Sequence, residues 1–194
     1  MWPAALYTPM VVWQGWCATG LGGWSTRGIE LFVLVPLWGL LLAIGGGLMA
    51  FSRGLRSLPA GGARAGMVTG CALVLAFVPC AIVGQRLRMR GFLRAGERAA
   101  PLVAAIDSYI ADQGRPPESL EELVPRWLRA LPERLPPLQL VTDTDRNGNR
   151  WLLVASVPSG ILNFDEFVYL PNQDYSRGWG GSFQRLGRWG YLHE

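Results

Sequence analysis

Residues 86–132, RLRMRGFLRAGERAAPLVAAIDSYIADQGRPPESLEELVPRWLRALP, join an apolar half of the chain to a polar half of mixed charge. Within this stretch apolar residues recur at spacings of three and four, which places them on one face of a helix. They are Leu102, Val103, Ile106, Tyr109 and Ile110. Gly114 stands where a helix C-cap belongs, and Pro116 and Pro117 prevent continuation. The stretch therefore predicts an amphipathic helix that ends just before Gly114.

A second helix start follows at once. Ser119 precedes Glu122 by three residues, which is the spacing of a capping box. In such a box the Ser hydroxyl and the Glu carboxylate each accept a hydrogen bond from a backbone N–H of the first turn. We therefore predict a short helix over residues 120–124, with core contacts through Leu120, Leu123 and Val124.

This pattern resembles the start of the head domain in pilin-like proteins, above all the major pseudopilin of type II secretion. In that family a long helix ends in a pattern of the form A-x-x-x-Y-x-x-D-x-G-x-x-P. The corresponding residues here are Ala105, Tyr109, Asp112, Gly114 and Pro117. The resemblance covers residues 99–192. It implies an α+β head, residues 99–194, in which a long helix and a short capped helix precede a small antiparallel sheet.

The sequence after Pro137 changes to the pattern of strands. Residues 138–141 and 151–157 flank TDTDRNGNR, in which Asn147-Gly148 is typical of a hairpin. Residues 164–170 and 188–192 predict a third and a fourth strand, separated by a glycine-rich loop. In the strand at 151–157, alternate apolar side chains fall on both faces, as expected where a helix covers one side. One face holds Trp151, Leu153, Ala155 and Val157, and the other holds Leu152 and Val154.

Charge divides the chain in the same place. Residues 1–98 hold nine Arg against two acids, a balance of +7, whereas residues 99–194 hold nine Arg against twelve acids, a balance of −3. A basic half that is also apolar indicates contact with phospholipid headgroups. The acidic balance of the folded half argues against a nucleic-acid partner.

Two uncharged runs predict a two-helix transmembrane anchor within residues 29–85. Residues 31–51 and 65–84 are each long enough to cross a bilayer core of about 30 Å as a helix. The three glycines at 45–47 permit close approach of a neighbouring helix, and Gly66 and Gly70 form a G-x-x-x-G pattern. We therefore expect the two spans to pack against each other.

Residues 1–28 form a tryptophan-rich segment without a strongly apolar core. Trp favours the membrane interface, so we predict an interfacial segment, with a third span as the alternative. Gly28 and Glu30 partly resemble the processing site of true prepilins. In that site the Glu lies five residues after the Gly, whereas here it lies two residues after it. We therefore do not expect prepilin processing. The free thiols Cys17, Cys71 and Cys80 predict neither a disulfide framework nor a metal site.

Residues 86–98 predict a basic helical linker. Arg86, Arg90, Arg94 and Arg98 recur every fourth residue and form one slowly drifting stripe on a helix. The stripe suits anionic headgroups or an acidic partner, and the alternative is a solvated helix flank.

Topology has two readings. Arg27 and the five Arg of residues 86–98 outnumber the three Arg of the loop between the spans, which by the positive-inside rule places both termini in the cytoplasm. The resemblance implies the opposite, because pilin-like heads face outward. We adopt the second reading and expect a multi-pass protein of the bacterial inner membrane with a periplasmic head.

Two groups of acids are candidate calcium ligands. Asp143, Asp145, Asn147 and Gly148 spell D-x-D-x-N-G, the opening of a calcium loop. The twelfth position is Val154 and not an acid, so a polar hairpin tip is the alternative. The second group lies towards the C-terminus and consists of Asp165, Glu166 and Asp174.

Nothing in the sequence predicts catalysis. His193 is the only histidine, and residues 99–194 contain no cysteine nucleophile. We therefore predict a non-enzymatic structural or protein-interaction component. Its partners would be membrane lipids and another membrane or extracytoplasmic protein. The alternative is a membrane-anchored sensor that binds calcium or another ligand.

Overall fold

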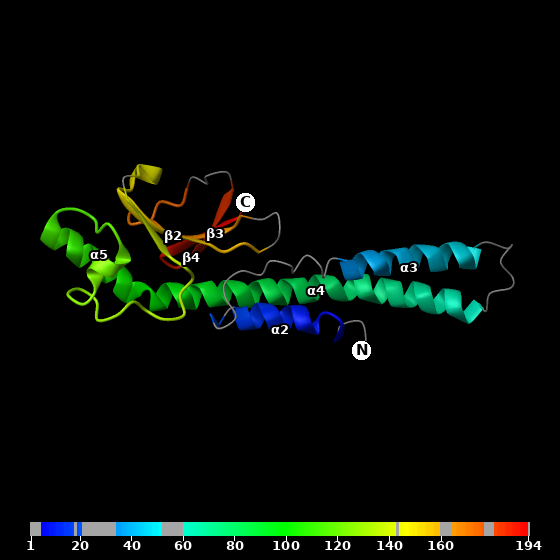
Figure 1. Ribbon diagram of the computed structural model, residues 1–194. Helices are drawn as coiled ribbons and strands as arrows, with labels where there is room; N and C mark the ends of the chain where they lie inside the picture. Colours follow the sequence, from blue (N-terminus) through cyan, green and yellow to red (C-terminus); the bar gives the residue numbers. More distant parts are fainter. Residues whose placement is uncertain are drawn as a thin grey trace. The chain divides into compact units, whose positions relative to one another are not determined.

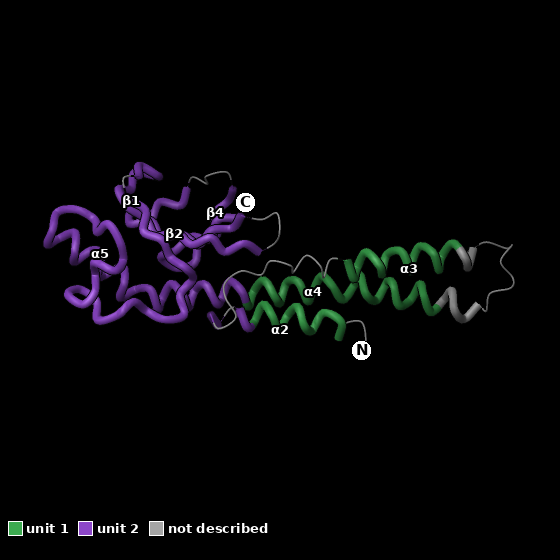
Figure 2. Tube along the Cα trace, viewed as in Figure 1, with its two compact units in different colours: residues 1–15, 27–87 green, residues 16–26, 88–194 purple. Residues whose placement is uncertain are grey.

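The computed structural model describes residues 5–17, 19–20, 34–51, 60–142, 144–159, 164–176 and 181–193. The chain divides into two compact units (Figure 2). We call residues 1–15 and 27–87 the helical unit and residues 16–26 and 88–194 the head.

The fold combines helices with an antiparallel sheet, which confirms the predicted α+β class. The helices are α2 (Thr8–Cys17), α3 (Leu34–Phe51), α4 (Ala60–Arg98) and α5 (Ala100–Gln113), with 3-10 turns η2 (Leu120–Leu123) and η3 (Arg146–Gly148). The strands are β1 (Gln139–Thr142), β2 (Trp151–Ser156), β3 (Glu166–Tyr169), β4 (Ser182–Leu186) and β5 (Trp189–His193). Figure 1 shows α4 as the longest element, shared by both units.

In the helical unit, α3 packs against α4 through glycine. A Cβ atom on Gly39 would lie 2.9 Å from the Gly70 carbonyl oxygen, and one on Gly70 would lie 2.7 Å from the Ala43 backbone nitrogen. The contact predicted for Gly70 is therefore confirmed. Gly45 and Gly47 face open space. The middle glycine of the predicted run, Gly46, is buried, and the close backbone approach described here is at Gly39 and Ala43.

The tryptophan-rich segment contains α2, which packs along α4 within the helical unit. The Tyr7 hydroxyl donates to the Leu73 carbonyl oxygen at 2.9 Å, and the Tyr7 ring meets the Phe77 ring edge-on at 5.6 Å. Further along α2, the Gln14 side chain lies directly over Gly84. These contacts place α2 beside the second uncharged run. The predicted interfacial position of residues 1–28 is not tested by them.

One helical stretch of the described residues is long and apolar enough to cross a membrane. It runs over Ala65–Gln113, and Leu34–Leu48 forms a shorter apolar helix. Many large apolar side chains of α3 and α4 are exposed, with exposed fractions of 66% for Trp38 and 74% for Leu75. One of the two predicted spans therefore has a helix of sufficient length and apolar composition, whereas the span predicted over residues 31–51 stays a prediction.

Among the described residues of the head, five antiparallel strands form one sheet in the order β1-β2-β3-β5-β4. The predicted hairpin is confirmed, because β1 pairs with β2 in a register that puts Thr142 opposite Trp151. The third and fourth predicted strands correspond to β3 and β5. The strand β4 was not predicted and belongs to the glycine-rich segment, where it pairs with β5 and forms the sheet edge.

The two faces of β2 behave as predicted. Trp151, Leu153, Ala155 and Val157 join the main core with α4 and α5, whereas Leu152 packs in a second cluster on the opposite face. The second cluster contains Leu152, Val168 and Leu170, with Val141, Val154, Tyr175 and Phe183 at its margin. The alternation of side chains along the strand accounts for both clusters.

Helix α5 has the predicted end and the predicted buried face. Gly114 adopts φ 72°, and its N–H donates to the Ile110 carbonyl oxygen at 2.8 Å. Pro101 lies in the first turn, as its missing N–H allows. Leu102, Val103, Ala105, Ile106 and Tyr109 are buried.

The predicted capping box does not form, because Ser119 makes no capping bond and Glu122 bonds the N–H of Glu118 and not that of Ser119. Residues 120–123 form a 3-10 turn, and the Ser119 side chain makes no capping hydrogen bond. The Glu122 carboxylate accepts from the Glu118 N–H at 3.2 Å and from the Tyr109 hydroxyl at 2.7 Å. Pro125 holds the preceding residue in an extended conformation, so the turn is too short for a regular capped helix.

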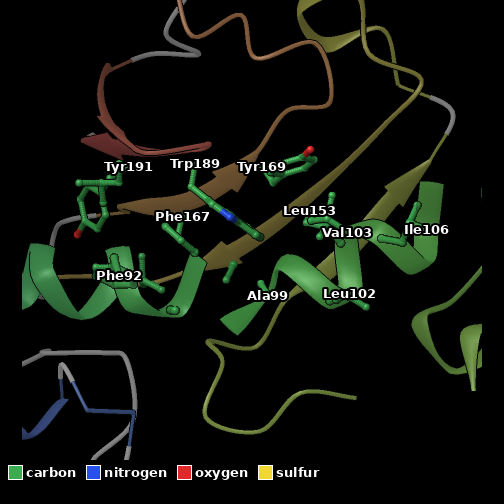
Figure 3. Close-up of a cluster of buried hydrophobic side chains, with 14 of the residues drawn as sticks. Phe92, Ala99, Leu102, Val103, Ile106, Leu153, Phe167, Tyr169, Trp189 and Tyr191 are labelled. Atoms are coloured by element: carbon green, nitrogen blue, oxygen red, sulfur yellow. The ribbon is translucent and has the colours of Figure 1, made fainter. Parts of the chain in front are cut away.

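Aromatic rings of the sheet form the centre of the head core (Figure 3). Phe167 and Trp189 stack with ring centroids 4.5 Å apart, and Phe92 of α4 lies 5.1 Å from the Phe167 ring. The Trp189 indole also closes over Gly96, where a Cβ atom would lie 2.6 Å from Trp189 Cδ1. Only glycine fits at this point of α4.

The Gly96→Ala substitution should therefore destabilise the head. The added methyl overpacks the Trp189 contact, and the better helix propensity of Ala offsets part of this, leaving a loss of about 1–2 kcal/mol. Pulse proteolysis of the detergent-solubilised full chain in urea measures the change. Gly45→Ala, which adds a methyl in open space, is the control. Equal stability of the Gly96→Ala protein and the wild type would refute the packing account.

Candidate functional site

The predicted arginine stripe lies on α4. Arg86, Arg90 and Arg94 are exposed, whereas Arg98 is half-buried and donates from Nη2 to the Arg134 carbonyl oxygen at 3.1 Å. Three of the four side chains are thus accessible to anionic headgroups or to an acidic partner. The fourth binds the segment that follows η2 and therefore serves the fold.

A fifth arginine of this region, Arg88, is buried in the head with 2% of its surface exposed. Its Nη2 donates to the Val157 carbonyl oxygen at 2.5 Å and to the Tyr191 hydroxyl at 3.2 Å. The Tyr191 hydroxyl in turn donates to Asp165 Oδ2 at 2.5 Å, and Asp165 is 1% exposed. The Arg88 guanidinium also lies 5.2 Å from the centre of the Phe92 ring. A buried cation and a buried carboxylate are therefore linked through one hydroxyl.

The electrostatics of this cluster keep Tyr191 protonated. Burial raises the pKa of Tyr191 far above its usual value of about 10, the Arg88 charge opposes that rise, and the hydrogen bond to Asp165 reinforces it. The hydroxyl therefore remains a donor to Asp165. Because the cluster is closed to solvent, it suits structural fixation of α4 on the sheet better than proton transfer.

Sequence reasoning on the stripe did not identify Arg88 as a core residue. A signal was present, because Arg88, Phe92, Ala95 and Ala99 recur at spacings of four, three and four and form one helix face. All four are buried. An arginine that shares a face with consecutive apolar residues requires internal partners, and here the sheet provides them.

The first candidate calcium group is described in part. Asp143 lies outside the described residues. Asp145 is exposed, and its carbonyl oxygen accepts from the Gly148 N–H at 2.8 Å. Asn147 adopts φ 51° and donates from Nδ2 to the Asp174 carbonyl oxygen at 2.9 Å. The hairpin loop is thus held against the loop that contains Asp174.

The second candidate group does not assemble. Asp165 is buried beneath Tyr191, Glu166 is half-buried on β3, and Asp174 Oδ1 accepts from the Ser176 N–H at 3.0 Å. No three His, Cys, Asp or Glu residues among those described lie close enough together to hold a metal ion. Calcium binding stays a prediction that depends on the hairpin loop and its neighbour.

An asparagine pair joins these two loops. Asn149 is 3% exposed and donates from Nδ2 to Asn172 Oδ1 at 3.0 Å, and Asn149 Oδ1 accepts from the Asn172 N–H at 3.0 Å. These hydrogen bonds satisfy the buried Asn149 side chain. They fix the loop after β3 beside the β1–β2 hairpin loop.

Tyr175 holds the end of the same loop on the sheet. Its hydroxyl donates to the Arg188 carbonyl oxygen at 2.8 Å and accepts from the Leu170 N–H at 3.0 Å. Its ring covers Gly190, where a Cβ atom would lie 2.5 Å from the ring. Burial raises the pKa of Tyr175 to about 12, so its hydroxyl stays protonated across the physiological range.

Comparisons of the chain with protein-family models, with curated proteins and with solved structures gave no match. The resemblance to the pseudopilin head therefore remains a prediction that rests on the residues from Ala105 to Pro117. The expected lack of enzyme activity likewise remains a prediction.

Arg88→Met should weaken the head strongly, because it removes the buried cation that is linked to Asp165 through the Tyr191 hydroxyl, while keeping much of the side-chain volume. Breaking a buried charge pair costs about 3–5 kcal/mol. Arg90→Met is the matched control on the exposed face of the same helix, with an expected change within about 0.5 kcal/mol.

Urea unfolding of the full chain in detergent, followed by pulse proteolysis, provides the measurement. Adding Asp165→Asn to Arg88→Met should recover part of the loss, since it removes the buried negative charge that Arg88 no longer balances. Strictly additive effects of the two substitutions would contradict coupling through Tyr191.

Proposed function

We propose that the chain is an integral membrane protein that presents a small α+β head and acts as a structural or protein-interaction component. The observation that supports this proposal is the helical stretch Ala65–Gln113. Only 11% of its most apolar window is buried inside the molecule, which favours a membrane span over the core helix of a soluble fold. Farther along the same stretch, Leu102, Val103 and Ile106 are buried in the head core.

The finer proposal concerns form and topology. The head would resemble the pseudopilin head of type II secretion, in which a sheet covers a long helix. With α3 as a second span, α3 and α4 would form a hairpin in the bacterial inner membrane. Helix α3 contains 18 residues, which at 1.5 Å each gives about 27 Å and approaches the hydrocarbon thickness. The head would then face the periplasm.

Membrane insertion is tested by alkaline carbonate extraction of membranes that contain the full chain. We expect the wild type to stay in the membrane pellet. Leu75→Arg together with Val78→Arg, both at exposed positions of α4, should shift much of the chain to the supernatant, because each central Arg costs about 2.5–3.5 kcal/mol. Ala111→Arg with Gln113→Arg, at exposed positions of α5, is the charge-matched control.

The same chain with a topology reporter after Glu194 tests the orientation. An alkaline phosphatase reporter, which is active only outside the cytoplasm, should be active. An inactive reporter on a membrane-inserted chain would place the head in the cytoplasm and leave the anchor intact. Wild-type chain in the carbonate supernatant would refute the anchor itself.

A calcium-responsive head is the second candidate. The favouring observation is that Asn147 and Asp174, which belong to two separate candidate groups, are joined by a hydrogen bond between neighbouring loops. A calcium ion held by these loops would engage carboxylate and amide oxygens from Asp143, Asp145 and Asn147.

Calcium chloride should then raise the melting temperature of the head in the detergent-solubilised full chain, because a ligand that binds only the folded state stabilises it. Magnesium chloride at equal concentration is the ion control. Asp145→Asn should remove the rise, whereas Glu118→Gln, at another exposed acid, should retain it. A melting temperature that calcium does not change would refute the sensor.

A further inference from the structure

An apolar cavity of about 350 Å³ lies within the head, between the end of α4, the start of α5 and the β4–β5 hairpin. Its residues are Leu93, Gly96, Glu97, Ala100, Val103, Tyr169, Leu186, Gly187, Arg188 and Trp189. The helix side extends from Leu93 to Val103, which at 1.5 Å per residue is roughly 15 Å. The cavity, called the groove below, therefore has the volume of about one or two large side chains, and its helix side covers two to three turns.

The groove has an apolar floor and an exposed apolar residue at one end. Trp189 and Leu186 are 3% and 8% exposed and form part of the floor, whereas Leu93 is 40% exposed. Trp189 is held in place by its stack on Phe167. A rigid apolar floor with an accessible apolar edge suits insertion of one large apolar side chain.

The charges around the groove have a definite order. Arg90 and Glu97 are exposed on α4, one turn before and one turn after Leu93. Arg188 is positioned across the groove, where its Nη2 donates to the Tyr169 hydroxyl at 2.7 Å. Within the described part of the chain, the Glu97 carboxylate forms no hydrogen bond or ion pair. Along α4 the groove is therefore bordered by a cation (Arg90), then an apolar side chain (Leu93), then an anion (Glu97).

Two other possible occupants of the groove, a second copy of this chain and an anionic lipid, match this order of charges less well. In two parallel copies anchored in one membrane, equivalent residues meet, so that Arg90 would face Arg90 and Glu97 would face Glu97. An anionic lipid headgroup would be attracted by Arg90 and Arg188, but it would be repelled by Glu97 and would leave that carboxylate without a partner. A helix of a different protein can complement both charges at once.

We propose that this groove binds an amphipathic helix of another protein. The helix carries one large apolar side chain that enters the groove, an acid on one side of it that pairs with Arg90, and a base on the other side that pairs with Glu97. This inference rests on the proposed interaction function and specifies the surface and the partner for it. Electrostatic complementarity of this kind fixes the register of the bound helix.

The test is site-specific photo-cross-linking of the full chain in its native membrane, with p-benzoylphenylalanine in place of Ala100. We expect an adduct with a helical segment of another protein in which an acid and a base flank a large apolar residue, each about one turn away. Glu97→Arg should lower the yield by about tenfold or more, since like charges across an interface cost over 1.4 kcal/mol. Glu121→Arg, an equal charge change at an exposed residue outside the groove, should not lower it.

Rescue makes the test specific. Changing the partner's base to an acid should restore cross-linking to the Glu97→Arg chain, which a general loss of folding would not allow. An adduct with lipid, with a second copy of this chain, or with a segment lacking the charge pattern would overturn the proposal. So would failure of the charge reversal to rescue.

The same photo-cross-linking residue at Phe164 and Ala111, both exposed and outside the groove, separates this proposal from the function on which it rests. If protein adducts form at either of these positions but not at Ala100, the groove is not the binding surface. The proposed interaction function would then still hold. The absence of protein adducts at all three positions would overturn both.

Discussion

The head depends on the contact between the inner face of its sheet and the helix face that runs from Phe92 to Tyr109. The Phe167–Trp189 stack is nearly parallel, with 5° between the ring planes, and Phe92 closes its helix side. Such ring pairs contribute about 0.5–1.5 kcal/mol beyond the burial of their area. The Trp189 indole lies against Gly96 of α4. Because glycine has no side chain, the sheet can approach the helix closely at this point.

The Arg88 cluster adds a directional constraint to this apolar contact. Hydrophobic packing alone tolerates small shifts of a helix along a sheet, whereas hydrogen bonds to Val157 and Tyr191 require one register. A buried ion system of this kind contributes little net stability compared with apolar packing, since its desolvation is costly. Its consequence is that the position of α4 in which both hydrogen bonds form is favoured over shifted ones. The backbone hydrogen bond from Val157 to Asp165 extends the same constraint to the connection between β2 and β3.

The sequence predicted the parts of the fold in which local pattern and tertiary packing agree. Gly114, the two faces of β2 and the buried face of α5 followed from spacing alone. The edge strand β4 did not, because SFQRL shows little apolar alternation and three of its five residues are exposed. Its position depends on pairing with β5 across Gly187, whose φ of 65° suits a tight hairpin turn. The capping box failed because Pro125 holds Val124 in an extended conformation and leaves only a 3-10 turn, in which Glu122 bonds Tyr109, a residue 13 positions earlier.

The candidate sites divide in the same way. The exposed arginines were predictable, since a four-residue period needs no knowledge of the sheet, but the burial of Arg88 requires partners from Val157 and Tyr191 that local sequence does not indicate. The groove is even harder to predict from the sequence, because β4, β5 and the α4–α5 junction meet only in the folded head. A binding surface built from distant segments forms only when the core forms. Loss of the Trp189 contact would therefore remove the groove together with the stability of the head, and binding should be compared only among variants of equal stability.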